Sequence, residues 1–354
     1  MSQEPPSTAR EGLANEDRAA SPAVAVDGPF YDDLAIGDRF DSAPTMQLTD
    51  GLAATHHAIV GGRLRLAFDA ALSASVTGRA QPFASPGLVW DLAIGQSTLI
   101  TQHAIANLLY RGLAFRRAPA IGDSLKTVTT VIGLRPVGAK PDRPPRGLVT
   151  MRVATRDQDD RPVLDFCRCA MLPARTAASA GAQGITDLPP SDFSVPQLSA
   201  AAEAWNLDPY RKAAPGPHFD DMRAGTVYRP AGGDVVSSAP ELARLTLNLA
   251  IIHHDRTAAT GGRRLVYGGH TVGLAAAQLT RVLPGLVTIL GWHDCDHLGP
   301  VHEGDTVHSE AAVERCEALP GGGGLVHLRS LVRSTNTAGD VSDVLDWRLI
   351  GLFA

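Results

Sequence analysis

An amide and an imidazole stand five residues apart in a stretch that is otherwise aliphatic. The stretch is "LTLNLAIIHHD", Leu245 to Asp255, and the two side chains are Asn248 and His253. On a helix, five residues turn through roughly 500°, so the two side chains would lie on different faces, and on a strand they would face opposite sides. They can meet only if the backbone turns between them. A turn lined with polar groups at the edge of a core commonly forms a site.

These two residue types could carry out acid–base chemistry, and one reaction that could use them is the addition of water to a conjugated thioester. That reaction needs a base for the water, an acid for the α-carbon and donors for the developing enolate oxygen. His253 has an ordinary pKa of about 6.5 and can accept and return a proton, whereas Asn248 can only orient a partner by hydrogen bonds. The alternative is a hydrogen-bonded structural histidine. His254 is expected to face the other way, and Asp255 to hydrogen-bond locally.

The donors for the enolate oxygen are expected at the start of a following helix. The segment "HTVGLAAAQLTRVL", His270 to Leu283, has helical length and apolar residues on nearly every side, which predicts a buried helix. Its first N–H groups point along the favourable helix dipole. Gly268 and Gly269 directly precede it, and their lack of side chains would let a thioester carbonyl approach closely.

Composition favours a small molecule or a protein as the partner. The chain has 354 residues, of which 44% are hydrophobic and 19% charged, and its formal net charge is -5. No basic domain or run is present, so neither nucleic acid nor an anionic membrane is expected as a partner. The N-terminus lacks an apolar signal region, and no apolar window is long enough to span a membrane. Four cysteines without metal-type spacing predict reduced thiols, and together these features predict a cytoplasmic protein.

Four short motifs occur twice in the same order, which predicts a duplicated domain. We expect a disordered tail at 1–29, an N-terminal domain at 30–172, a linker at 173–215 and a C-terminal domain at 216–354. The paired motifs are "YDDLAIG" (Tyr31 to Gly37) with "FDDMRAG" (Phe219 to Gly225), Thr77-Gly78 with Thr260-Gly261, Gly122-Asp123 with Gly304-Asp305, and "VLDF" (Val163 to Phe166) with "VLDW" (Val344 to Trp347).

Each half is predicted to wrap an antiparallel sheet around one buried helix. The N-terminal helix is "SPGLVWDLAIGQSTLI", Ser85 to Ile100, and the C-terminal helix is the one near His270 to Leu283. Strand-like runs follow each helix, such as "GLVTMRVATRDQ", where apolar and polar residues alternate. The predicted fold class is therefore α+β.

This pattern resembles the MaoC-type double hotdog hydratases and dehydratases. The likeness lies in the "DD…GD" openings, the buried helix, the tandem duplication and the strand entries "PAIGD" (Pro119 to Asp123) and "PVHEGD" (Pro300 to Asp305). Within that group the sequence around Asn248 is most similar to that of mesaconyl-CoA hydratases (β-methylmalyl-CoA dehydratases). The resemblance implies two tandem hotdog domains and reversible hydration of a 2-enoyl-CoA, with a short branched or dicarboxylic acyl group among the options.

The resemblance also implies roles for particular residues. MaoC-type hydratases place an Asp and, five residues later, a His beside the buried helix, and Asn248 and His253 fall on those positions. The departure from Asp to Asn leaves His253 as the main proton carrier. Gly269 is implied as the oxyanion donor, with Gly268 and His270 beside it. In the N-terminal half, Gly62 and Ala67 stand at the matching positions, which implies a degenerate site.

Several alternatives stay open at this stage. A hotdog thioesterase would need a carboxylate or an activated water, and a catalytically silent acyl-CoA binding protein is kept open by Asn248. His293, Cys295 and His297 would share one strand face, but a polar strand at the cleft is preferred over a metal site. Arg263 and Arg264 would either contact coenzyme A phosphates or lie in a solvated loop. No cofactor is expected beyond the coenzyme A of the substrate, and a homodimer is left open.

Overall fold

The two halves of the chain repeat one order of secondary-structure elements. The computed structural model describes residues 27–138, 143–176, 181–258 and 262–354. The N-terminal half contains β1 (Arg39–Phe40), β2 (Met46–Gln47), α1 (Asp50–Val60), α2 (Ala70–Thr77), α3 (Pro86–Gln96), β3 (Ala106–Phe115), β4 (Ser124–Pro136), β5 (Arg146–Arg156) and β6 (Pro162–Pro173). The C-terminal half contains β8 (Val227–Tyr228), β9 (Asp234–Val235), α6 (Ala239–Leu245), α7 (Ile251–His254), α8 (Gly268–Val282), β10 (Leu286–His297), β11 (Thr306–Ala318), β12 (Gly324–Thr335) and β13 (Val341–Phe353).

The strands of both halves join into one antiparallel sheet. The described residues form a 13-stranded sheet whose main path is β1-β4-β5-β6-β3-β10-β13-β12-β11-β8. Reading outward from the centre, the order in the first half matches that in the second, and β3 pairs with β10 at the seam. The predicted α+β double hotdog is therefore confirmed, with the two sheets continuous through their central strands.

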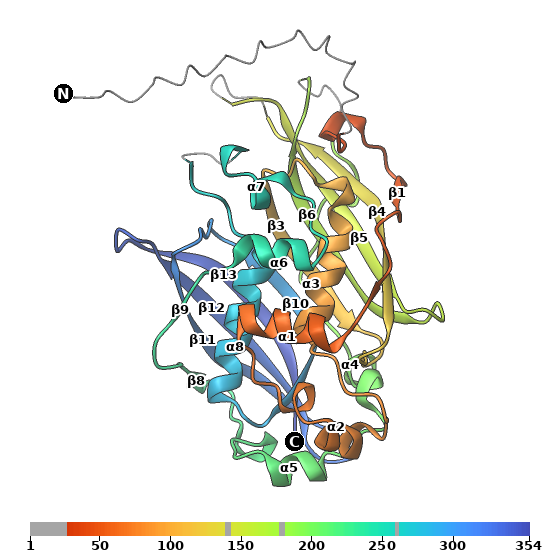
Figure 1. Ribbon diagram of the computed structural model, residues 1–354, viewed down its shortest axis with the longest axis vertical. Helices are drawn as coiled ribbons and strands as arrows, with labels where there is room; N and C mark the ends of the chain where they lie inside the picture. The colour runs from red at the N-terminus through yellow and green to blue at the C-terminus, as the bar shows by residue number, and fades with distance from the viewer. Residues whose placement is uncertain (1–26, 139–142, 177–180, 259–261) are drawn as a thin grey trace, which may run out of the picture.

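The two long helices lie next to each other on the inner face of this sheet (Figure 1). Every residue of α3 is buried, as its all-round apolar sequence predicts. The expected helix Ser85 to Ile100 divides into α3 and a 3₁₀ turn from Ser97 to Ile100, and the expected helix near His270 begins at Gly268. Helices α1 and α6 contact each other and cover the outer side of this helix pair.

A single apolar core runs through both halves. Trp90 of α3 packs edge-on against Trp292 of β10 and Trp347 of β13, with ring centroids 5.0 and 6.2 Å apart. All three indoles are almost completely buried. Because the helix of the first half packs on strands of the second, neither half would keep this core if it folded alone.

The duplication extends to individual hydrogen bonds. A glutamine near the end of each long helix binds a strand of its own half, β4 or β11, in the same way. Its amide nitrogen donates to a backbone carbonyl, and its amide oxygen accepts from a hydroxyl. The two sets are Gln96 with Leu125 and Thr127, and Gln278 with Val307 and Ser309. Gly37 and Gly225 likewise share a positive φ and a bond to the matching strand. The paired Thr260-Gly261 motif lies outside the described residues.

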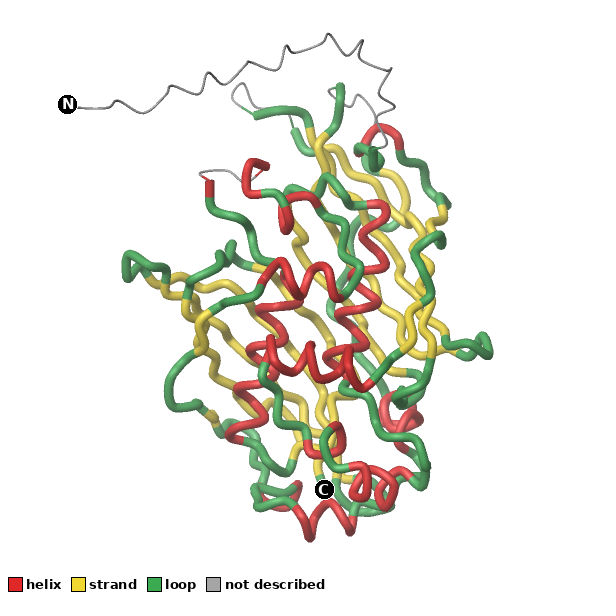
Figure 2. The backbone as a smooth tube through the Cα atoms, viewed as in Figure 1, coloured by secondary structure: helices red, strands yellow, loops and turns green. Residues whose placement is uncertain are grey.

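The predicted linker crosses the outer face of the sheet at the seam. It carries β7 (Gln183–Gly184), α4 (Val195–Ser199) and α5 (Asp208–Ala213), and Ser191 donates its N–H to the carbonyl of His293 on β10. Figure 2 shows helices gathered at the end of the molecule where the C-terminus lies, and Figure 1 labels α5 among them. Residues 1–26 of the predicted tail lie outside the described residues.

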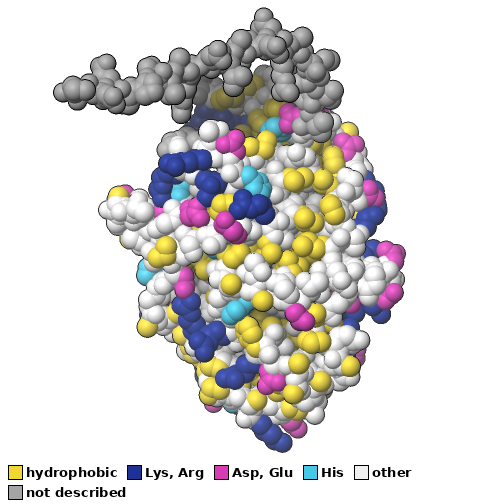
Figure 3. Space-filling model, in the orientation of Figure 1, with side chains coloured by type: hydrophobic (Ala, Val, Ile, Leu, Met, Phe, Trp, Pro, Cys, Tyr) yellow, Lys and Arg dark blue, Asp and Glu magenta, His cyan; other side chains and the backbone are white. Residues whose placement is uncertain are grey.

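Surface charges of both signs are scattered among apolar side chains on the face that carries α1 and α6 (Figure 3). All four cysteines, each within the described residues, carry free thiols. Within the same part of the chain, none of the helices combines the length and apolarity needed to cross a bilayer.

Gly95 provides a test of how closely the two halves must approach. A Cβ atom built on Gly95 of α3 would lie 1.7 Å from the carbonyl oxygen of Thr246, just before the Asn248 turn, whereas one on Gly87 of the same helix would meet nothing closer than 3.4 Å. We therefore expect Gly95→Ala to lower the free energy of unfolding by about 1–3 kcal/mol, as overpacking does.

Gly87→Ala is the matched control, and it should be neutral or stabilise by up to about 1 kcal/mol through helix propensity. Urea denaturation monitored by circular dichroism measures both variants. Equal stability of the two variants would show that the contact between α3 and Thr246 does not constrain the fold.

Candidate active site

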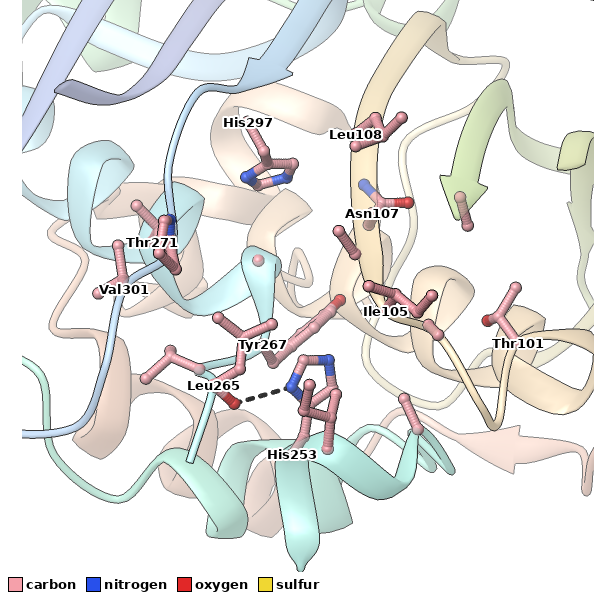
Figure 4. Close-up of a pocket in the computed structure, with 18 of the residues that line it drawn as sticks. Thr101, Ile105, Asn107, Leu108, His253, Leu265, Tyr267, Thr271, His297 and Val301 are labelled. Carbon is pink, nitrogen blue, oxygen red and sulfur yellow. Dashed lines mark hydrogen bonds between the residues drawn. The ribbon is translucent and has the colours of Figure 1, made fainter. Parts of the chain in front are cut away.

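A cavity of about 310 Å³ lies between the two halves. Its walls come from the C-terminal end of the α3 region, strands β3 and β6, the segment before and within α7, and the start of α8. Figure 4 shows His253 on one side of this space and Asn107 and His297 on the other. The residues that line it include Thr98, Thr101, Ile105, Asn107, Tyr110, Arg168, Asn248, His253, Leu265, Tyr267, Gly268, Thr271 and His297.

The backbone turns between Asn248 and His253, so both reach the same cavity. Helix α6 ends at Leu245, Leu247 adopts a left-handed φ of 60°, and α7 begins only at Ile251. The prediction that these two residues converge through a turn is confirmed. His254 points back and contacts the carbonyl oxygen of Asn248 through Nε2 at 2.6 Å, which fixes the turn from behind.

Hydrogen bonding determines which atoms of Asn248 remain available. Its Oδ1 accepts the backbone N–H of Ala250 at 2.9 Å, and because that partner can only donate, the amide oxygen is assigned. The next N–H in the chain, that of Leu249, donates to Thr98 Oγ1 of the N-terminal half at 2.7 Å. Asn248 therefore offers the cavity its Nδ2 donors rather than an acceptor.

His253 is held as a neutral acceptor. Its Nδ1 lies 2.9 Å from the carbonyl oxygen of Leu265, so Nδ1 carries the proton and Nε2 has the lone pair. Burial lowers the pKa of His253 to about 4, the Leu265 carbonyl opposes this shift, and positive charge at His254 and Arg168 adds to it. At neutral pH the imidazole is therefore uncharged and able to accept a proton.

The start of α8 faces the same space. Gly268 lines the cavity, and the first N–H groups of a helix have no partner within it. The N–H of His270 already donates to the carbonyl of Tyr267, and its ring is fully buried outside the cavity lining. Gly269 lies against the other half, because a Cβ there would be 2.2 Å from Asp91 Oδ1.

A buried polar chain that was not predicted from the sequence lies beside this helix start. Asp91 of α3 is completely buried, with Oδ2 2.9 Å from His56 Nε2 and Oδ1 accepting the Tyr267 hydroxyl at 3.2 Å. Burial raises the pKa of Asp91, while His56 and Tyr267 oppose that rise. The available signal was the single carboxylate in the middle of an otherwise apolar helix, "PGLVWDLAIGQ".

A second cavity of about 310 Å³ occupies the matching place in the N-terminal half. Gly62 and Ala67 line it, as do His56, Phe68 and Gly87. The N–H of Arg63 donates to Thr280 Oγ1 at 2.9 Å, mirroring the bond from Leu249 to Thr98, so Gly62 occupies the position of Asn248. This cavity therefore lacks the amide and the imidazole of the first one at the equivalent positions.

Strand β10 does not present its polar residues on one face. The register with β13 shifts between Trp292 and Asp294, so His293 turns outward to stack on His327 while His297 lines the cavity and Cys295 joins the core. The expectation that His293, Cys295 and His297 share a face is thus wrong because of this bulge. The described residues contain no cluster of ligands suited to a metal ion.

Other expected contacts are local. Asp255 accepts hydrogen bonds from the backbone and hydroxyl of Thr257, as predicted. Arg263 pairs with Asp305 at 2.5 Å, and Arg264 pairs with Glu303. These ion pairs fit the alternative of a loop held at the protein surface.

Several known proteins are similar to this chain, although no family model matches it. β-Methylmalyl-CoA dehydratase of Chloroflexus aurantiacus is 29% identical over 83% of this chain and 84% of its own, and mesaconyl-CoA hydratase of Cereibacter sphaeroides is 27% identical over 88% and 90%. The double hotdog structure of RV0216 from Mycobacterium tuberculosis is 50% identical, with a TM-score of 0.82 over 92% of this chain and 98% of that one. A MaoC domain dehydratase structure from Chloroflexus aurantiacus is 26% identical, with a TM-score of 0.80 over 94% and 99%.

The chain belongs to the MaoC-like double hotdog family. As a family member it combines two hotdog units with one cavity that carries polar side chains at the motif positions. The roles predicted for Asn248, His253, Gly268, Gly269 and His270 stay predictions.

The protonation state of His253 can be measured directly. We expect its imidazole to titrate near pH 4, below the ordinary value of about 6.5, because burial disfavours the charged form. Histidine-selective ¹H–¹⁵N spectra recorded from pH 7.5 downward measure this pKa, and His253→Gln assigns the resonance. A pKa at or above 6.5 would contradict a buried neutral base.

Proposed function

We propose that this protein reversibly adds water to the double bond of a 2-enoyl-CoA thioester. The observation that carries the proposal is the convergence of Asn248, His253 and the first turn of α8 on one cavity. The named relatives, a β-methylmalyl-CoA dehydratase and a mesaconyl-CoA hydratase, support the same reaction class.

The thioester is oriented by the start of α8 in this proposal. Its carbonyl oxygen accepts hydrogen bonds from the N–H groups of Gly268 and Gly269, which lie at the positive end of the helix dipole. As water attacks, negative charge develops on that oxygen, so these donors bind the transition state more strongly than the substrate. The close approach of Gly269 to Asp91 fixes where this helix starts.

The water lies between the side chains of Asn248 and His253. Asn248 donates from Nδ2 to the water oxygen, and Nε2 of His253 accepts one of its protons. The hydroxyl then bonds to the β-carbon, and the imidazolium returns the proton to the α-carbon, so water is added across the double bond with no other reactant. The neutral state of His253 is the starting state that this step requires.

Thioester hydrolysis is the leading rival within this fold. A hotdog thioesterase needs a carboxylate or an activated water at the thioester carbonyl, and the described residues that line the first cavity include neither Asp nor Glu. Crotonyl-CoA separates the readings, because hydration removes the absorbance of the conjugated enoyl thioester, hydrolysis releases a free thiol, and a silent binder does neither.

Substitution of His253 tests the proton carrier. We expect His253→Ala to lower kcat for crotonyl-CoA by about 10²-fold or more, the usual effect of losing a general acid and base. Asn248→Ala should reduce it less, because a misplaced water still meets His253. His308→Ala, an exposed imidazole on β11, is the matched control and should keep the wild-type rate.

Asn248→Asp distinguishes two versions of the mechanism. If the cavity accepts the carboxylate of the commoner family motif, activity should be kept or raised. If a neutral donor is needed, activity should be lost, because the carboxylate would still accept the N–H of Ala250 but would offer no Nδ2 donors to the cavity. A wild-type rate in correctly folded His253→Ala protein would remove His253 from the mechanism.

A further inference from the structure

The first cavity contains a second set of polar groups that the hydration steps leave unused. Arg168 of β6, Asn107 of β3 and His297 of β10 all line it. Both amide atoms of Asn107, Nε of Arg168 and Nε2 of His297 are buried and have no hydrogen-bond partner among the described residues. Buried polar atoms normally have partners, so this concentration in one cavity points to a ligand that supplies them.

Arg168 is unusual among these groups because it is a buried charge. Arg168 is only 3% exposed. Its Nη2 donates to Thr101 Oγ1 at 2.6 Å and to the carbonyl of Ser97 at 3.3 Å, and both acceptors are neutral. In the part of the chain that the structure describes, no carboxylate forms an ion pair with it. A guanidinium keeps its charge in proteins, so a buried one is costly until an anion joins it.

Neighbouring charges are already balanced. Arg111, the residue after Tyr110 of the cavity wall, pairs with Asp296 at 2.7 Å, and Arg117 pairs with Asp157. The buried carboxylate of Asp91 is occupied by His56 and Tyr267. Arg168 is therefore left facing the cavity without a counterion from these residues.

We propose that Arg168 and Asn107 bind a carboxylate at the far end of the acyl group. The inference rests on the proposed function, because the carboxylate enters with the thioester that His253 hydrates. Nε of Arg168 and Nδ2 of Asn107 supply donors for the carboxylate oxygens, and a charge-assisted bond to a guanidinium is among the stronger kinds. A cavity of about 310 Å³ shared with His253 fits a short acyl chain.

Binding of two saturated thioesters tests this subsite without requiring turnover. Succinyl-CoA and butyryl-CoA have acyl chains of equal length and differ in a terminal carboxylate against a terminal methyl. Isothermal titration with the full chain should show succinyl-CoA binding about 10-fold or more tightly, the ratio expected for one charged hydrogen bond or more. Arg168→Gln should bring that ratio close to one while changing butyryl-CoA affinity by less than a few-fold.

Two further variants separate this role from a structural one. Arg152→Gln on β5 removes an equal charge whose side chain is exposed, and it should keep the wild-type ratio. Asn107→Leu removes the Nδ2 donor and should also lower the ratio of succinyl-CoA to butyryl-CoA affinity. The subsite therefore stays testable if Arg168→Gln does not fold. A purely structural Arg168, holding Ser97 and Thr101 in place, would weaken both ligands equally.

The outcomes distinguish this inference from the proposed function. Equal binding of the two thioesters by wild type, or an unchanged preference in folded Arg168→Gln protein, would overturn the carboxylate subsite. Hydration of crotonyl-CoA would still stand in that case. A preference for succinyl-CoA without hydration of any enoyl thioester would support the subsite and refute the proposed reaction.

Discussion

The antiparallel pairing of β3 with β10 is the constraint on which the site depends. It joins two sheets at their central strands and thereby brings the helices of both halves side by side on one face. The start of α8 then lies next to α3, and Thr98, in the 3₁₀ turn that follows α3, receives the N–H of Leu249. The cavity is therefore made by both halves, and one half alone could not form it.

The same symmetry creates two cavities with different chemistry. Each contains the start of one long helix and the end of the other, and each is bounded by the turn that a threonine hydroxyl holds in place. One turn carries Asn248 and His253, and the other carries Gly62 and Ala67. A duplicated scaffold can keep both spaces open while the reacting groups remain at only one, because packing and chemistry depend on different residues.

Burial sets the protonation states on which the site relies. The desolvated imidazole of His253 stays neutral, and the nearby cation of Arg168 adds to that effect. Asp91, by contrast, is surrounded by donors from His56 and Tyr267 and connects α3 to Tyr267, the residue just before α8. A buried polar chain of this kind ties the position of the oxyanion donors to the packing of the two helices.

Much of the fold was predictable because duplication and hydrophobic patterning are properties of the sequence. The two buried helices and the strands after them follow from residue order and periodicity, and the turn between Asn248 and His253 was implied by the resemblance to MaoC-type hydratases. The joining of the sheets through β3 and β10 and the bulge near His293 were not predictable, because they depend on pairing between distant strands. Arg168 and Asn107 were missed for the same reason: each lies in an ordinary strand, and only the fold places both in the cavity.

A structure with bound butyryl-CoA tests whether the cavity of Asn248 and His253 is the active one, since this thioester can occupy the site without reacting. We expect the thioester oxygen at the N–H groups of Gly268 and Gly269, with the β-carbon facing Asn248 and His253. An acyl group seated instead in the cavity of Gly62 and His56, with the first cavity empty of ligand, would contradict the assignment of the active half.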